Sequence, residues 1–348
     1  MSSEHSTDAS APQRSSIFAD LDEADADEID KWQRTLRLWR ETLAEHWSLL
    51  TDELSVKLSM LTLAFFILVA IFARPIVVPV PLPGVGGVIV QPFSLAPYPP
   101  LERQYTDGLT IAKSLEPAFL GGHPDYLLGT TQQGYDIFSQ LVAGSRSALL
   151  VGLLAAVFTA GIGTMVGLIA GYYGGYVDDA LMRFVDFLYG LPLLPTVIIL
   201  VAVLGPSLFN IIAAVVILQW RATARVIRSQ ALSLRERPFV KAAQVAGASD
   251  WYILTRHLAP NVLPMSFLYG SFAIAWAIIT EAGVSFLGLG DPNTVSWGTM
   301  LQSARSYNAL TFGQWWWFVP PGICIALVVI SGFLIGRGYE EITNPKLQ

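Results

Sequence analysis

Long apolar runs separated by shorter polar segments dominate the pattern of this chain. A helix needs about 20 apolar residues to cross a lipid bilayer, and several runs have about that length. The pattern therefore predicts an all-α polytopic membrane protein. Its six expected transmembrane helices lie at residues 56–74, 147–172, 187–204, 208–221, 265–287 and 317–335.

Two of these runs carry internal signals. Gly163, Gly167 and Gly171 are spaced by four, so they share one helix face, and such a face allows a second helix to approach closely. We interpret them as helix-packing residues. Pro192 and Pro195 interrupt the third run, which predicts a kink in that helix.

The composition agrees with a membrane protein and narrows the function. The chain is 53% hydrophobic and 14% charged, whereas soluble domains are about a quarter charged. Of the 27 acidic residues, 13 lie within residues 1–56, so the net charge of -6 belongs mainly to the N-terminus and does not indicate nucleic-acid binding. One cysteine excludes a disulfide framework and a cysteine-based metal site.

The segments outside the runs differ in character. Residues 1–28 predict a disordered acidic tail. Residues 29–55 predict an amphipathic helix with tryptophans on its apolar stripe, lying on membrane lipid or packing on other helices. Residues 75–145 hold ten of the 21 prolines and predict a small irregular domain, with short strands near residues 85–90.

Basic residues set the expected orientation. The segment 221–264 carries seven Lys/Arg against two acids, and basic loops of membrane proteins lie on the cytoplasmic side. Both termini, including the tail 341–348, are then cytoplasmic, and the proline-rich domain is extracytoplasmic. The membrane core would span residues 146–340.

The basic segment also predicts local structure. Pro238 favours a helix start and Gly247 a helix end with positive φ, while Ser249 or Asp250 would cap a second short helix. Pro260 would end that helix before the fifth span begins. The result is two short helices joined by an elbow of small residues, including Ala242, Ala243 and Ala248.

Here the sequence resembles a known family. Ala242-Ala243, Gly247 and His257-Leu258-Ala259-Pro260-Asn261 are similar to the coupling loop, or EAA motif, of ABC importer permeases. The segments 171–178, 181–186, 204–207, 281–290 and 296–298 resemble the dipeptide/oligopeptide (peptide/nickel) branch and its second, "C"-type permease. The resemblance extends from about residue 123 to the C-terminus. It implies the type I importer permease fold.

The resemblance also implies a function and partners. The protein would be the permease of an ATP-driven peptide importer that works by alternating access. It would assemble with a second homologous permease, two ABC ATPase subunits and an extracytoplasmic peptide-binding protein. The coupling residues would be Lys241, Ala242, Ala243, Gly247, Ala248, Ser249, Asp250, His257 and Pro260. Lys241 departs from the family because an acidic residue is usual at its position, and dipeptides, oligopeptides, nickel complexes and glutathione-like compounds all remain open as substrates.

Missing motifs limit the chemistry. The chain has no phosphate-binding loop of the Gly-x4-Gly-Lys-Ser/Thr type, so ATP hydrolysis would fall to partner chains and this subunit would be no enzyme. No cofactor or metal is expected. Glu281 lies inside a predicted span and, with Ser285, is a candidate for gating or translocation. The alternative is an ion-coupled secondary transporter that uses Glu281 or Asp186 as its coupling group.

Overall fold

The computed structural model describes residues 53–73, 76–78, 88–91, 94–106 and 110–343. The expected acidic tail 1–28 and nearly all of the expected interfacial helix 29–55 lie outside these residues. Within them, five helices are long and apolar enough to cross a membrane, and one bent helix pair gives a sixth span if it is counted as one. The predicted all-α membrane fold is confirmed.

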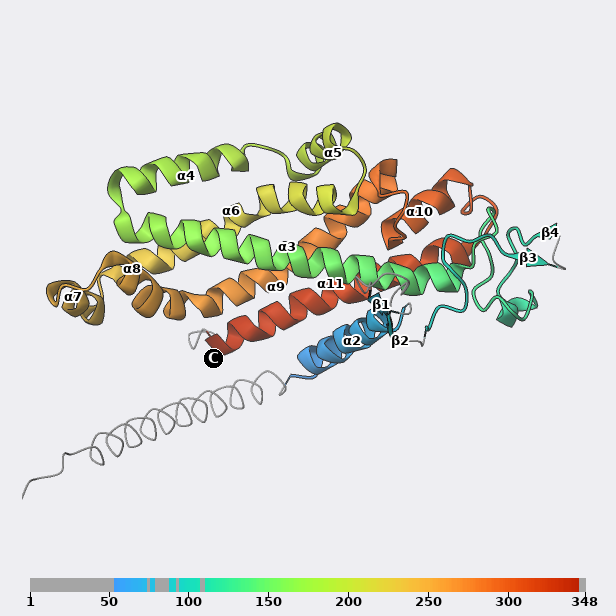
Figure 1. The fold of residues 1–348 in the computed structure, drawn as a ribbon, viewed down its shortest axis with the longest axis horizontal. Coiled ribbons are helices and arrows are strands. Elements are labelled where there is room, and N and C mark those ends of the chain that lie inside the picture. The colour runs from blue at the N-terminus through green and yellow to red at the C-terminus, as the bar shows by residue number, and fades with distance from the viewer. Residues whose placement is uncertain (1–52, 74–75, 79–87, 92–93, 107–109, 344–348) are drawn as a thin grey trace, which may run out of the picture. The chain divides into compact units, whose positions relative to one another are not determined.

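Three long helices form the centre of the bundle. Helix α3 (Ile137–Tyr173) packs along α6 (Leu208–Arg235) and α9 (Ala259–Val284). Helix α11 (Trp315–Thr343) packs on α9, and α2 (Leu54–Ile71) packs on α11 and α3. Figure 1 shows these helices lying side by side. At about 1.5 Å per residue, α3 is about 55 Å long and extends beyond a hydrocarbon layer of about 30 Å.

The helix bounds differ from the sequence-based ones at several ends. Helix α3 begins ten residues before the predicted second span, at Ile137, because Asp136 caps its N-terminus by accepting a hydrogen bond from the backbone N of Ser139 at 2.8 Å. Helix α6 continues through the predicted start of the basic loop as far as Arg235. The loop between these spans is therefore shorter than residues 221–264.

The kink that Pro192 and Pro195 predict in the third run, residues 187–204, is confirmed, and it is a full break between two helices. Helix α4 (Gly175–Tyr189) ends before the prolines, and α5 (Leu193–Leu204) starts after Pro192 with its axis turned by 88°. A residue before proline disfavours the helical conformation, so the chain breaks at Leu191. Pro195 lies in the first turn of α5, where no backbone donor is needed.

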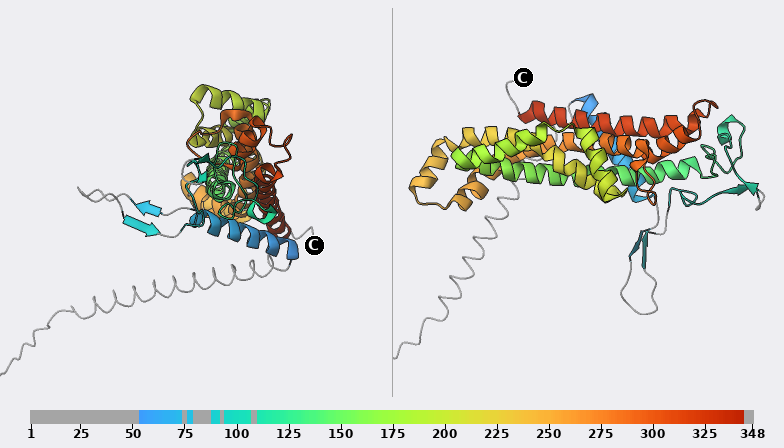
Figure 2. Two further views of the ribbon diagram at one scale, coloured as in Figure 1. Left: turned by 90° about the vertical axis from the view of Figure 1, so that its right-hand side faces the viewer. Right: turned by 90° about the horizontal axis from the view of Figure 1, so that it is seen from above.

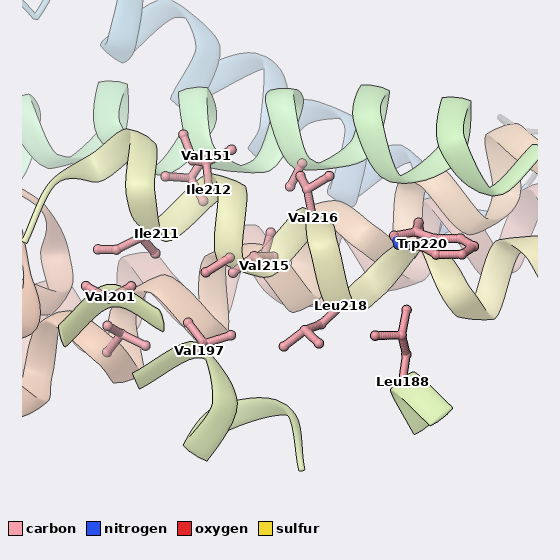
Figure 3. Packing of buried hydrophobic residues seen from close by; sticks show 14 of the residues in the cluster. Val151, Leu188, Val197, Val201, Ile211, Ile212, Val215, Val216, Leu218 and Trp220 are labelled. Atoms are coloured by element: carbon pink, nitrogen blue, oxygen red, sulfur yellow. The ribbon is translucent and has the colours of Figure 1, made fainter. Parts of the chain in front are cut away.

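The bent pair packs on α6 through the largest apolar core. In Figure 3, Val197 and Val201 of α5 face Val215 and Ile211 of α6, and Leu188 of α4 lies near Trp220. All of these side chains are buried. This core fixes α4 and α5 against the same helix that leads into the basic segment.

The predicted break at Pro260 is wrong. Residues Asp250–Leu289 form one 40-residue helical stretch. The segment η2 (Ile253–Leu258) is a π-helical turn in which the N–H of Ala259 bonds to the carbonyl of Leu254, five residues back. Because this wider turn precedes α9, Pro260 falls in the first turn of the α-helix and interrupts nothing.

The opposite end of the bundle is irregular. Strands β1 (Ile76–Val78) and β2 (Val88–Gln91) pair antiparallel, as do β3 (Tyr105–Thr106) and β4 (Thr110–Ile111), and η1 (Ala118–Leu120) follows. After α9, the π-helical turn η3 (Ser285–Leu289) leads to α10 (Trp297–Ser306), which begins with a capping box. Figures 1 and 2 show α10 and β3–β4 at one end of the long helices, and α7 and α8 at the other.

Candidate functional site

The basic segment folds into a helical elbow, here residues 238–258. Its first arm is α7 (Pro238–Val245), and its second arm is α8 (Asp250–Tyr252) continued by η2. Gly247 has φ +79°, and Ala248 N bonds back to Ala243 O at 3.0 Å. Ser249 caps the second arm by accepting a hydrogen bond from Tyr252 N at 3.3 Å. The turn therefore has the small-residue geometry that the sequence predicted.

One side of the elbow is anchored to the bundle. Val240, Ile253 and Leu258 are fully buried in an apolar cluster with residues of α3 and α6. The Tyr172 hydroxyl, at the end of α3, donates to Asp250 Oδ1 at 2.7 Å. Arg235 donates to the carbonyl of the same tyrosine at 3.1 Å. The elbow thus contacts the ends of α3 and α6 directly and continues into α9.

The other side of the elbow is open. Among the sequence-predicted coupling residues, Ala243, Ala248 and His257 are half-buried, and those exposed are Lys241, Ala242, Gly247, Ser249, Asp250 and Pro260. Sequence reasoning missed the two most prominent apolar side chains, Val245 at 90% and Trp251 at 75% exposed. Val245 and Trp251 do not fall on the helix faces that bury Val240 and Ile253. This helical spacing is the sequence signal that would have identified them as exposed.

The seven basic residues divide into two sets. Four arginines have partners within the bundle: Arg228 forms a two-pronged ion pair with Asp178, Arg225 forms an exposed ion pair with Asp186, and Arg221 donates to the Leu188 carbonyl. The fourth, Arg235, reaches α3 as described above. The guanidinium groups of Arg221 and Arg225 also lie 4.7 and 4.2 Å from the ring centre of Tyr189.

Three of these arginines, Arg221, Arg225 and Arg228, tie α4 to α6. The spacing of Arg221, Arg225 and Arg228 by four and three places them on one face of α6, whereas their acidic partners come from a separate helix. Asp178 is 8% exposed, so its ion pair with Arg228 is largely shielded from water. Sequence inspection notes these acids but does not pair them with the basic segment.

The remaining three basic residues of the segment point outward. Arg237, Lys241 and Arg256 are exposed. Lys241 Nζ lies 2.9 Å from Glu236 Oε2, and this contact, helped by Arg235, lowers the pKa of the Glu236 carboxyl. The lysine at the usually acidic position therefore has an acidic neighbour within its own loop.

Glu281 lies at the opposite end of α9. It is 2% exposed, and Ser285 donates a hydrogen bond to its carboxylate at 2.6 Å. Gly298 packs against this turn so tightly that an added Cβ would lie 2.7 Å from both the Ala282 backbone and the Ser285 Cβ. The two candidate gating residues thus meet at the junction of α9 and α10.

Two hollows lie along an exposed stripe of α3. One, of about 300 Å³, is lined near the start of α3 by Arg146 and Ser147 and by Asp291 and Asn293 of the loop after η3. The other, of about 670 Å³, is an apolar groove between α3 and α9 that reaches Trp251. In the described part of the chain, no three His, Cys, Asp or Glu side chains gather as a metal site would require.

This architecture defines a class of protein: a multi-span membrane protein with an exposed helical elbow at one end. Residues 163–348 match the family of binding-protein-dependent transport system inner membrane components. The chain belongs to this family. It is therefore a transport permease subunit and a multi-pass protein of an inner-membrane transport system.

Named relatives agree with the family. The chain is 35% identical to a putative peptide transport system permease protein of Brucella suis over 75% of this chain and 85% of the relative. It is 35% identical to a probable D,D-dipeptide transport system permease protein of Escherichia coli (63% and 72%). It is 34% identical to a dipeptide transport system permease protein of Bacillus subtilis (68% and 74%). A solved inward-facing MetNI methionine ABC transporter chain is 18% identical, with a TM-score of 0.46 over 59% of this chain and 97% of that one.

Proposed function

We propose that this protein is the permease subunit of an ATP-driven importer of peptides. The observation that carries the proposal is the elbow, an exposed surface built on the ends of three long helices in a chain of this transport family. The relatives named above are peptide or dipeptide permeases, which supports peptides as the substrate class.

The elbow would couple ATP hydrolysis on partner chains to the spans. It continues into α9 without a break, and Tyr172 and Arg235 link it to α3 and α6. A force on the elbow would therefore reach the central helices through hydrogen bonds and a buried cluster. Rigid rocking of these helices against a second permease would alternate access to the two sides.

The assembly would contain a second homologous permease, two ABC ATPase subunits and an extracytoplasmic peptide-binding protein. The elbow end would be cytoplasmic together with both termini, because the basic residues concentrate there. The end with α10 and the small strands would then face the binding protein. Glu281 and Ser285 would act at this outer end, in structure or gating, and the glycines of α3 would hold the helices together.

The ion-coupled alternative has less support. Its two candidate coupling groups already have partners, since Glu281 accepts a hydrogen bond from Ser285 and Asp186 pairs with Arg225. Family membership also favours a binding-protein-dependent importer.

Reconstituted uptake tests the proposal. The protein, its second permease and its ATPase subunits are placed in proteoliposomes, with binding protein and a labelled tripeptide outside and ATP at the elbow side. We expect uptake only with ATP and only with the ATPase subunits present. Uptake driven by a proton gradient without the ATPase subunits would contradict the proposal.

A further inference from the structure

The elbow has an apolar tip. Val245 and Trp251 flank Gly247, and an added Cβ at this glycine would meet nothing within 4 Å. Exposed apolar side chains of this size are typical of residues that a partner covers, and Trp251 also lines the apolar groove between α3 and α9. The tip, residues 245–251, therefore fits the apolar floor of a cleft.

Three exposed basic residues lie in the elbow or directly before it. The Phe239 and His257 rings lie 6.1 Å apart, so the start of α7 meets the end of the second arm. Arg237, Lys241 and Arg256 flank this contact in sequence and are all exposed. In the described residues Glu236 is the one acid paired with any of them, through Lys241. We call these three residues the basic collar.

Two residues of the collar, Arg237 and Arg256, differ from the four arginines that have partners within the bundle. Arg221, Arg225, Arg228 and Arg235 each contact a residue of α3 or α4. Within the described part of the chain, Arg237 and Arg256 form no ion pair. The collar therefore offers two exposed arginines without an acidic partner in the described residues, together with Lys241, which pairs with Glu236 of its own loop.

We propose that the elbow docks into an ATPase cleft whose floor is apolar and whose rim carries Asp or Glu side chains that face the basic collar. The inference rests on the proposed function and specifies the partner surface. Opposite charges at the rim of an interface set its association rate and its choice of partner. An ATPase with a basic rim would be rejected, so the collar would select the cognate subunit among similar ATPases.

A zero-length carbodiimide cross-linker tests this contact, because it joins a lysine amine to a carboxylate only when they touch. The purified complex of this protein, its second permease and its ATPase subunits is treated and analysed by mass spectrometry. We expect Lys241 to be joined to an Asp or Glu of the ATPase, with loss of that product in Lys241→Gln. A product joining Lys241 only to Glu236, or no product from Lys241, would overturn the inference.

Charge reversal gives a second, quantitative test. The double variant Arg237→Glu/Lys241→Glu should bind the ATPase subunits roughly tenfold more weakly in discs of neutral lipid, with a smaller effect at high salt. The matched control is Arg183→Glu, which reverses an exposed arginine of α4 outside the elbow and should leave binding unchanged. A loss confined to discs of anionic lipid would mean that the collar binds lipid headgroups and would overturn the inference.

The variant Val245→Asp separates this inference from the proposed function, because its exposed site tolerates a charge without unfolding. If Val245→Asp abolishes ATPase binding and the double reversal does not, the acidic rim is wrong and the docking function stands. If Val245→Asp leaves ATPase binding and peptide uptake unchanged, the docking role of the elbow is wrong as well.

Discussion

A single methyl group added at Gly167 should separate α3 from α6. An ideal Cβ at this position would lie 2.5 Å from the Ala224 carbonyl oxygen and 2.8 Å from the Ile227 Cβ. Both distances are well below van der Waals contact. The Ala224 carbonyl oxygen belongs to the backbone of α6, so it cannot move aside by a side-chain rotation. The helices would have to move apart, and the core around Ile227 would lose contacts.

The magnitude follows from two opposing effects. Overpacking of a tight site costs about 1–3 kcal/mol, and the backbone contact places Gly167→Ala near the upper limit. Alanine gains about 0.5–1 kcal/mol over glycine in a helix. The net loss is therefore about 2 kcal/mol in the free energy of unfolding, which corresponds to about 4–8 °C in Tm at the 2–4 °C per kcal/mol of domains with 150–250 residues.

The same helix supplies a matched control. An added Cβ at Gly161 would meet nothing within 4 Å. Gly161→Ala should therefore raise or preserve Tm, because only the helix propensity changes. Thermal unfolding of both purified full-length variants in one detergent, followed by tryptophan fluorescence, measures the difference. Equal Tm values for the two variants would refute the close α3–α6 contact.

Three further predictions concern the hydrogen bonds and ion pairs. Tyr172→Phe removes the hydroxyl that donates to Asp250. We expect ATP hydrolysis to continue in reconstituted vesicles while the number of peptides taken up per ATP hydrolysed falls severalfold. An unchanged ratio of peptide uptake to ATP hydrolysis would contradict this. Asp178→Asn breaks the shielded ion pair with Arg228 and should lower the unfolding free energy by about 2–4 kcal/mol, measured as loss of Tm in detergent; an unchanged Tm would show that the pair adds nothing. Burial raises the pKa of the Asp136 carboxyl above its value in the unfolded chain. The folded state therefore binds this proton more tightly than the unfolded state does. The free energy of unfolding should fall as pH rises from the unfolded pKa through the raised folded pKa. Asp136→Asn keeps a capping oxygen and should flatten this part of the stability profile, from the unfolded pKa of Asp136 upward; an identical slope in both proteins would refute the assignment.

The membrane class and the position of the elbow could be predicted from the sequence. Apolar runs must be buried in lipid or protein, so their length alone indicates spans. Pro238, Gly247 and Ser249 act through their own backbone geometry, and the structure shows the helix start, the positive φ and the cap at these positions. Sequence rules are sufficient at these positions because each residue acts on its own stretch of backbone.

The breaks in the helices depended on neighbouring residues. Pro192 ends a helix and Pro260 does not, although both follow apolar residues. The difference is the π-helical turn before Pro260, which shifts the hydrogen-bond ladder by one residue. A proline rule applied to sequence alone cannot foresee this shift.

The roles of the charged residues were decided by tertiary structure. In sequence the seven basic residues of the segment look equivalent, but the fold brings Asp178 and Asp186 of α4 against α6 and so commits some of them to internal contacts. Arg237, Lys241 and Arg256 are left exposed. The sequence by itself determined which segments enter the membrane and where the elbow bends, because burial of apolar groups and backbone geometry are properties of short segments. Only the packing of α4 on α6 decided which basic residues of the segment form ion pairs within the bundle, because an ion pair depends on residues far apart in the chain.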